Sequence, residues 1–367
     1  MKRGNRMTIG IDGRFYSESG VGRYIRNLIS NLQLLDKKNE YFIFMLSKDL
    51  PLFSDSKNFK KNKADFSWYG IAEQVKFPKL LEKYKLDLMH FPHFNVPIFY
   101  SGKFVVTIHD LIHQHYQMKR ATTLNPITFK LKQLGYGKVF KHAVNKSCEI
   151  MVPSNSVKQL LFDEWKVDLD KIIVTPEAVD SRLLTIARKN PPINAPYIFY
   201  VGNAHPHKNV EGLIMAFLEL KKENNDLQLV LSGASSYFWQ NLKKQYPLPG
   251  IIYTGAVNDE ELVGLYKNAR VFVMPSFEEG FGLSILEAMA LGCPVVASNT
   301  ASLPEVGGNA AVYFNPGNLG DMVNKINQVL KNKGLRDQLI EKGRKRYKEF
   351  SWEKLAKQTL EVYTKCG

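Results

Sequence analysis

The stretch "EEGFGLSILEAMALGCPVV", residues 278–296, decides the fold class of this chain. An apolar helix pattern begins at about Leu283, directly after two closely spaced glycines. Its stripe has the i, i+3, i+4, i+7 spacing of a buried helix face and consists of Leu286, Met289, Ala290 and Cys293. The pattern therefore predicts a core helix that connects the apolar run before it to the strand pattern at its end.

Two glutamates, Glu279 and Glu287, bracket the start of this helix. The preceding "RVFVMPS" reads as a strand, so Glu279 is expected in the loop at the carboxyl end of that strand. Gly280 and Gly282 would let the backbone approach a ligand closely, and free amides at a helix start favour an anion such as phosphate. Glu287 could accept hydrogen bonds from sugar hydroxyls. The alternative is structural: Glu279 caps the helix and Glu287 lies on a solvated polar face.

Strand patterns alternate with helix patterns through both halves of the chain. In the first half the expected strands are 8–11, 41–46, 103–108, 149–152 and 171–175, and the expected helices include 22–35 and 126–144. In the second half the expected strands are 197–201, 227–233, 251–255, 270–274 and 294–297. After residue 318 the pattern is helical to the end. Such alternation predicts an α/β fold with two Rossmann-like parallel sheets, whose ligands lie beyond the carboxyl ends of the strands.

The composition is that of a globular protein. The 367 residues are 44% hydrophobic and 23% charged, which argues against disorder. The three cysteines, Cys148, Cys293 and Cys366, are far apart and odd in number, which argues against a disulfide framework and for a reducing compartment. No signal-peptide pattern follows the basic start, and no run of about 18 apolar residues predicts a membrane span. We therefore expect a cytoplasmic protein.

The positive charge is concentrated in the first half of the chain. Residues 1–190 contain 31 Lys and Arg against 18 Asp and Glu, a net of +13, whereas residues 191–367 contain 19 against 17, a net of +2. The basic runs are 59–63, 76–85 and 130–146. They are either a solvated surface or a face for anionic lipid headgroups or an anionic acceptor. Nucleic acid is the weaker explanation, because neither a binding motif nor interleaved aromatic residues accompany the lysines.

The string "PSFEEGFGLSILEAMALGCPVVAS" resembles the E-x7-E signature of the retaining glycosyltransferases of family four, which have the GT-B fold. The resemblance covers nearly the whole chain, through "SGVGRYIRNL", "VTIHDL", "VTPEAVD", "VGNAHPHKN" and "ASLPEVGGNAAVYFNP". It implies two Rossmann-like domains that face each other across a cleft, with a C-terminal helix that crosses back to the first domain. The expected boundaries are an acceptor-binding domain over 1–187, a linker over 188–197, a donor-binding domain over 198–348 and a returning helix over 349–367.

The resemblance also assigns roles to individual residues. Glu279 would contact the hydroxyls of the donor sugar, Glu287 the nucleotide ribose, and Lys208 the diphosphate. The family often has Arg where this chain has Asn203, so a second cationic phosphate contact is in doubt, and His205 or His207 could replace it or be ordinary loop histidines. Backbone amides would bind the sugar and diphosphate at Gly280, Phe281, Gly282 and Leu283, and across the cleft in a glycine loop at Gly20 and Gly22.

Histidines of the first half offer two further sites. His109 follows the strand at 103–108, and the resemblance places it beside the anomeric carbon of the donor, with Asp110 orienting its ring. His90 and His93 could suggest a metal pair, although no set of Cys or carboxylate ligands accompanies them. We expect neither a metal ion nor another cofactor, since cations and amides would stabilise the leaving diphosphate.

The implied reaction is transfer of a sugar, with retention of configuration, from a nucleotide-diphosphate donor to a glycan or lipid-pyrophosphate-linked saccharide. The motifs "IDGRF" and "GVGRYIRNL" resemble those of bacterial mannosyl- and rhamnosyltransferases of surface polysaccharide assembly, which makes GDP-mannose the favoured donor. The basic first half suggests attachment to an anionic inner membrane face, and no nucleic-acid partner is expected. The alternatives are a nucleotide-sugar epimerase on the same fold and a non-catalytic protein that binds nucleotide sugars.

Overall fold

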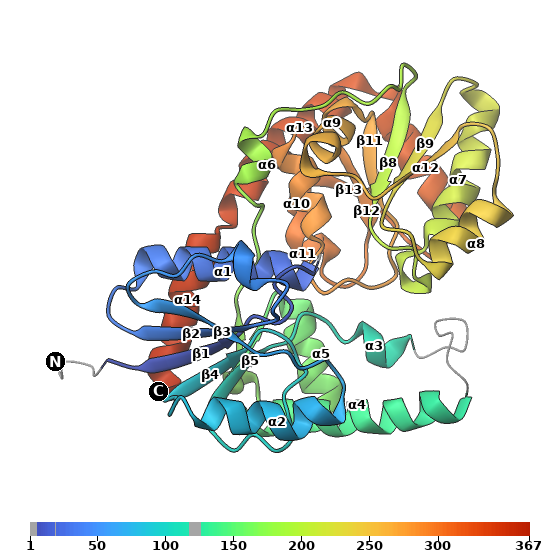
Figure 1. Cartoon of the computed structure of the whole chain (residues 1–367). Coiled ribbons are helices and arrows are strands. Elements are labelled where there is room, and N and C mark those ends of the chain that lie inside the picture. Colours follow the sequence, from blue (N-terminus) through green and yellow to red (C-terminus); the bar gives the residue numbers. More distant parts are fainter. Residues whose placement is uncertain (1–5, 19, 117–125) are drawn as a thin grey trace. The chain divides into compact units, whose positions relative to one another are not determined.

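The computed structural model describes residues 6–18, 20–116 and 126–367, and for residues 126–134 it describes the backbone alone. The chain divides into two compact units (Figure 1). Unit 1 consists of Met1–His109, Thr122–Glu177 and Trp352–Gly367, and unit 2 consists of Asp110–Ala121 and Ala178–Ser351. Each unit is built around its own parallel sheet, as the alternating pattern predicts.

The sheet of unit 1 has the strand order β3-β2-β1-β4-β5-β6-β7. Its strands are β1 (Thr8–Asp12), β2 (Glu40–Met45), β3 (Phe59–Lys63), β4 (Leu88–Phe91), β5 (Phe104–Thr107), β6 (Ile150–Val152) and β7 (Ile172–Val174). The helices of this unit are α1 (Gly20–Leu35), α2 (Ile71–Glu82), α4 (Pro126–Lys146), α5 (Asn155–Trp165) and α14 (Trp352–Cys366), with short 3-10 turns at Leu50–Leu52 and Leu169–Lys171. Figure 1 shows α1 and α2 on opposite faces of the sheet.

The sheet of unit 2 has the strand order β10-β9-β8-β11-β12-β13. Its strands are β8 (Tyr197–Val201), β9 (Gln228–Ser232), β10 (Ile251–Gly255), β11 (Val271–Met274), β12 (Val295–Ser298) and β13 (Ala311–Phe314). Its helices are α3 (Ile112–His115), α6 (Arg182–Thr185), α7 (Val210–Glu223), α8 (Tyr237–Gln245), α9 (Asp259–Asn268), α10 (Leu283–Ala290), α11 (Leu303–Gly307), α12 (Leu319–Lys331) and α13 (Lys333–Arg346). Short 3-10 turns lie at Pro206–Lys208, Gly308–Ala310 and Tyr347–Glu349.

The helix predicted from Leu283 is α10, and it is a core helix. Ile285, Leu286 and Met289 are fully buried, and a Cβ on Gly343 of α13 would lie only 3.0 Å from the Met289 side chain, so the two helices pack closely. The predicted stripe is longer than the helix, because α10 ends at Ala290 and Cys293 is buried in the turn before β12.

The last helix belongs to unit 1, as expected for a C-terminal helix that returns to the first domain. Its packed face includes Trp352, Leu355, Thr359 and Val362, which are all buried and recur at the spacing of one side of a helix. Three strands escaped prediction, namely β3, β4 and β13. β3 has the sequence FKKNK and lies at one edge of its sheet, where lysines discourage pairing with another chain. Because of these lysines, the segment was interpreted from the sequence as a basic run and not as a strand.

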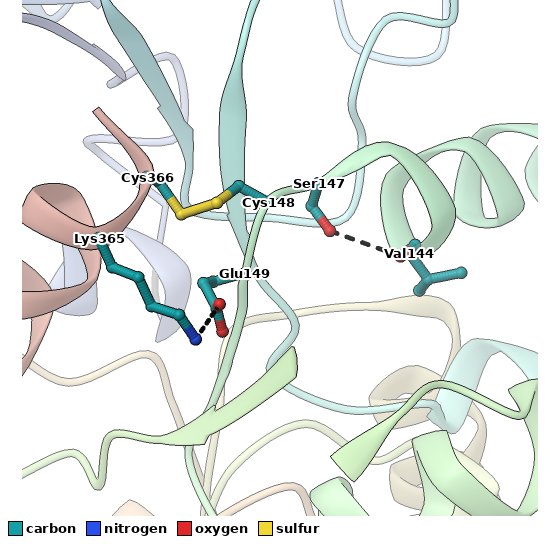
Figure 2. Close-up of a disulfide and its surroundings, with 6 residues drawn as sticks. All are labelled: Val144, Ser147, Cys148, Glu149, Lys365 and Cys366. Carbon is teal, nitrogen blue, oxygen red and sulfur yellow. Dashed lines mark hydrogen bonds and ion pairs between the residues drawn. A yellow bond between two sulfur atoms is a disulfide. The ribbon is translucent and has the colours of Figure 1, made fainter. Parts of the chain in front are cut away.

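The cysteine prediction is wrong. Cys148, just before β6, and Cys366, at the end of α14, form a disulfide with a Cα–Cα distance of 6.0 Å (Figure 2). Beside it, Lys365 pairs with the buried carboxylate of Glu149. The sequence separation of 218 residues hides the pairing, because only the return of α14 to unit 1 brings the two thiols together. Cys293 is free and buried.

None of the helices in the described parts of the chain is long and apolar enough to cross a membrane.

Candidate functional site

The strand order of unit 2 places a topological switch point between β8 and β11. The chain winds outward from β8 through β9 and β10 and then returns to β11 on the other side of β8. In open parallel sheets, ligands bind where the loops leave the sheet at such a point. The loop after β8 carries Lys208, and the loop after β11 carries Glu279, so the two residues singled out in the sequence meet at this position.

Lys208 and Glu279 form a bidentate ion pair. The Lys208 Nζ donates to both carboxylate oxygens of Glu279, at 2.7 and 2.8 Å, and the Ser276 hydroxyl donates to Oε1 at 2.6 Å. The two charged side chains are only 16% and 9% exposed, so each charge relies on the other rather than on water. The site thus presents an ammonium and a carboxylate held together at a loop junction.

The two loops are tied to each other by further hydrogen bonds. Asn209, with a left-handed φ of 52°, donates its side-chain amide to the carbonyls of Pro275 and Pro316 at 3.1 and 3.2 Å. The Phe277 amide donates to the carbonyl of His207 at 2.8 Å. Because these bonds bridge the loops on both sides of the ion pair, Lys208 and Glu279 are held in fixed register.

The backbone after Glu279 is shaped by Gly282 and Ser302. Gly282 precedes the first residue of α10 with a φ of +98°, and a Cβ there would lie 2.6 Å from the Leu303 side chain, so the position requires glycine. The Ser302 hydroxyl lies 2.9 and 2.8 Å from the carbonyls of Glu279 and Phe281. The first amides of α10 consequently follow a rigid turn, which is the arrangement an anion-binding helix start needs.

The structural alternative for the two glutamates is wrong. Gly282, not Glu279, stands at the N-cap of α10. Glu287 is 3% exposed, and its Oε2 accepts a hydrogen bond of 3.2 Å from the Tyr266 hydroxyl. Glu287 is therefore a buried, oriented carboxylate rather than part of a solvated face.

The other predicted donor residues of unit 2 surround this core. Phe281 is buried with its ring edge-on to Phe350, Gly280 is buried, and Leu283 is half-buried. Asn203 is exposed and shapes the loop after β8. Its side chain accepts from the His205 amide at 3.2 Å, and its carbonyl accepts from the Tyr200 hydroxyl at 2.6 Å.

Neither nearby histidine supplies the cation that the family often has at position 203. Burial and the charge of Lys208 lower the pKa of His207 to about 3, and burial together with His113 and Lys208 also lowers the pKa of His205. Both rings are therefore neutral near pH 7, and of these three residues only Lys208 brings a positive charge.

His109 lies at the carboxyl end of β5 in unit 1. Its Nδ1 lies 3.1 Å from Glu177 Oε1, its Nε2 lies 3.0 Å from the Pro92 carbonyl, and its ring meets Tyr24 edge-on at 4.8 Å. Both nitrogen partners are acceptors, so the ring can donate to both only as an imidazolium. The expectation that Asp110 orients the ring is wrong. Glu177 takes that role, and Asp110 accepts from the Ile112 amide at 3.0 Å.

A buried polar chain supports the back of this site. His90 contacts the Tyr363 hydroxyl at 2.7 Å through Nδ1 and Thr107 Oγ1 at 2.8 Å through Nε2, and Thr107 in turn contacts the Tyr24 hydroxyl at 3.1 Å. Burial, with a smaller effect of His109, lowers the pKa of His90 to about 3. His90 is thus a neutral core residue whose nitrogens are both engaged.

The structure does not favour a metal pair at His90 and His93, because both ring nitrogens of His90 already contact hydroxyl groups, while the His93 ring packs against Phe15 at 4.9 Å. Within the described residues, one cluster brings three candidate metal ligands together. It contains the disulfide cysteines and Glu149.

Gly20 and Gly22 do not form a loop: they lie in the first turn of α1. A Cβ on Gly22 would lie 2.7 Å from the carbonyls of Phe15 and Tyr16, so this glycine allows close packing of the helix start. A Cβ on Gly20, which is exposed, would meet nothing within 4 Å. Gly20 is therefore the position where the backbone is open to a ligand.

Several residues that build the site escaped sequence reasoning. Glu177 contacts His109, and Ser276 contacts Glu279. Ser302 contacts the backbone carbonyl of Glu279, and Tyr266 contacts the carboxylate of Glu287. Glu177 and Ser276 lie within three residues of the ends of β7 and β11, and that position was the signal that could have identified them. Tyr266 and Ser302 carry no such signal.

Two family models match the two halves of the chain. Residues 19–183 match the family model for Glycosyltransferase Family 4, and residues 184–346 match the model for Glycosyl transferases group 1. The chain is similar to O-antigen chain mannosyltransferase B of Escherichia coli, with 28% identity over 95% of this chain and 96% of that protein. It is also 30% identical to the MMP alpha-(1->4)-mannosyltransferase of Mycolicibacterium hassiacum, over 63% of this chain and 57% of that one.

Among solved structures, the sucrose-phosphate synthase of Thermosynechococcus elongatus superposes with a TM-score of 0.75 at 21% identity, covering 98% of both chains. The fold and the two matched models define a glycosyltransferase of the GT-B class. Within that class, the chain combines a first half that matches Glycosyltransferase Family 4 with a second half that matches Glycosyl transferases group 1.

Proposed function

We propose that the chain transfers a mannosyl residue from a nucleotide-diphosphate sugar, GDP-mannose, to a glycan or lipid-pyrophosphate-linked saccharide in the synthesis of a surface polysaccharide. The observation that carries this proposal is the Lys208–Glu279 pair at the switch point of unit 2. The similarity to O-antigen chain mannosyltransferase B over nearly the full length of both chains supports the choice of sugar and of product.

We assign the donor roles as follows. Lys208 binds the diphosphate, Glu279 accepts hydrogen bonds from the sugar hydroxyls, and Glu287 binds the ribose. The amides at the start of α10 complete the anion site. As the glycosidic bond breaks, negative charge grows on the diphosphate, and a preorganised ammonium with backbone amides stabilises it without a metal ion. The ion pair suits this reaction, because Lys208 and Glu279 hold each other in position before the donor binds.

We assign His109 to the transferred sugar. Glu177 and the Pro92 carbonyl contact the two ring nitrogens, so the ring is held in a fixed orientation. Front-face attack by the acceptor, with the leaving phosphate taking the acceptor's proton, would retain the anomeric configuration and needs no separate nucleophile.

We also propose that the enzyme attaches to an anionic membrane face through its basic first half. The favoured patch, residues 130–146, lies on α4, and its residues 130–134 fall outside the described side chains. Four apolar residues of this run could insert shallowly into the membrane or belong to the core. Leu131 and Leu134 lie outside the described side chains, Phe140 is fully buried in unit 1 and is excluded, and Val139 is half-buried. Co-sedimentation with anionic but not neutral vesicles, lost at high salt, is the expected result. Equal binding to neutral vesicles would contradict it.

A screen of nucleotide sugars tests the main proposal. The purified chain is incubated with GDP-mannose, UDP-glucose and dTDP-rhamnose, with and without a mannose-containing acceptor, and released nucleoside diphosphate is measured. GDP release from GDP-mannose that persists in EDTA is expected. A nucleotide sugar converted to its epimer without diphosphate release would indicate an epimerase, and binding without turnover would indicate a non-catalytic protein. NMR of the new glycosidic bond reports the anomeric configuration.

A further inference from the structure

A cavity of about 560 Å³ opens in unit 2 beside the Lys208 loop. It lies between the residues around the start of α7 and helix α8, and Phe277 closes one side. The residues that line this cavity do not include any of those assigned above to donor binding. However, His205, Pro206 and Asn209 do, and they flank Lys208 in the chain, while Phe277 lies two residues before Glu279. The cavity is therefore an immediate neighbour of the proposed donor site, and its volume is in the range of small-molecule sites.

Aromatic rings form the apolar part of the lining. Tyr237 is 54% exposed and Phe277 is 39% exposed, which are high values for large rings that could have been packed inside. Phe238 also lines the cavity, with the centroid of its ring 5.5 Å from that of Tyr237 and 4.5 Å from that of His205. These rings thus offer flat, partly open faces to whatever occupies the cavity.

Hydrogen-bonding groups form the polar part. Tyr237, Asn241 and Gln245 are spaced four residues apart on α8, so they lie along one face of that helix. Glu211 of α7 faces them and accepts from Gln245 at 3.3 Å and from the Tyr246 hydroxyl at 2.8 Å. The exposed amide of Asn241 has no hydrogen-bond partner within the described part of the chain.

We propose that this cavity is a saccharide subsite, which binds a neutral sugar unit of the acceptor glycan. A pyranose ring has an apolar C–H face, which stacks on an aromatic ring, and hydroxyls at its rim, which pair with amides and carboxylates. Other ligands fit less well. An aliphatic chain would cover Asn241 and Glu211 without satisfying them, and a phosphate would be repelled by Glu211. The assignment to the acceptor rests on the proposed function, and it gives unit 2 a part of the acceptor-binding role that the sequence assigned to residues 1–187.

Binding of mannotriose to the full-length protein, measured by calorimetry, tests the subsite. Tyr237→Ala removes one ring face and Asn241→Ala removes one amide, and both positions are exposed, so folding should be unaffected. Gln240→Ala is the matched control, because Gln240 is the exposed neighbour of Asn241 on the same helix and does not line the cavity. The expected result is a dissociation constant raised roughly two- to tenfold by each cavity variant and unchanged by the control.

Hydrolysis of the donor in the absence of acceptor is measured in parallel and should be the same in all four proteins. Equal mannotriose binding by the wild type and both cavity variants would overturn the subsite. So would preferential binding of dodecyl phosphate that Tyr237→Ala abolishes, since the occupant would then be a lipid. Mannotriose binding that depends on Tyr237, in a protein that hydrolyses no nucleotide sugar, would support the saccharide subsite and refute the transferase proposal.

Discussion

Separating the two halves of the Lys208–Glu279 pair gives the most direct test of the donor assignment. The variants are Lys208→Ala, which removes the only charge proposed to meet the diphosphate, and Glu279→Gln, which keeps the shape of the side chain and removes its charge. The Nζ lies 2.7 and 2.8 Å from the two carboxylate oxygens, so both variants break the same pair. If the pair were merely structural, both would have the same effect on ligand binding.

The donor assignment predicts opposite effects instead. A charge-assisted hydrogen bond contributes about 1.5–3 kcal/mol, so Lys208→Ala should weaken binding of GDP by about 10- to 150-fold and leave binding of guanosine nearly unchanged. Glu279→Gln releases the ammonium from its carboxylate, so GDP should bind at least as well as in the wild type. Turnover should nevertheless fall by about 10²–10³, because a contact to the sugar in the transition state is lost.

Calorimetry with GDP and guanosine, combined with GDP release from GDP-mannose, measures both effects. Lys331→Ala is the control. Lys331 pairs with Glu223 at a similar distance, 2.8 Å, but both side chains are more than half exposed. Its removal should therefore change neither GDP binding nor turnover. The reasoning is refuted if Lys208→Ala weakens GDP and guanosine equally, or if Glu279→Gln weakens GDP as much as Lys208→Ala does. Thermal unfolding curves verify that each variant is folded.

Three further outcomes are expected. Glu287→Ala should weaken binding of guanosine and GDP alike, as measured by calorimetry, with Tyr266→Phe intermediate because it removes one hydrogen bond to that carboxylate. Reducing the Cys148–Cys366 disulfide should lower the free energy of unfolding in urea by up to about 5 kcal/mol, from the chain entropy of a 218-residue separation, and an unchanged midpoint would count against the crosslink. The neutral, buried His90 has a pKa of about 3, so between pH 6.5 and 3 the unfolded chain holds a proton that the native chain lacks. Stability should therefore fall with falling pH by up to about 1.4 kcal/mol per unit, and His90→Gln should flatten that slope in urea unfolding.

Local patterns account for most of what could be predicted. The helix from Leu283, the alternation of strands and helices and the buried face of the last helix all follow from the spacing of apolar residues, which reports the period of each element. The strands at Phe59–Lys63 and Leu88–Phe91 were missed for a local reason as well. The first is an edge strand rich in lysine, and the second is four residues long and contains a histidine. Neither carries enough apolar periodicity to stand out.

The sequence by itself determined which functional groups stand at the ends of strands, because side-chain chemistry and strand periodicity are properties of neighbouring residues. Only the tertiary structure decided which of these groups meet. Lys208 and Glu279 are 71 residues apart, His109 and Glu177 are 68 apart, and the two disulfide cysteines are 218 apart. The first two meetings depend on the order of strands in each sheet, and the third depends on the return of the last helix. Those are set by the pairing of distant segments, which no local pattern encodes.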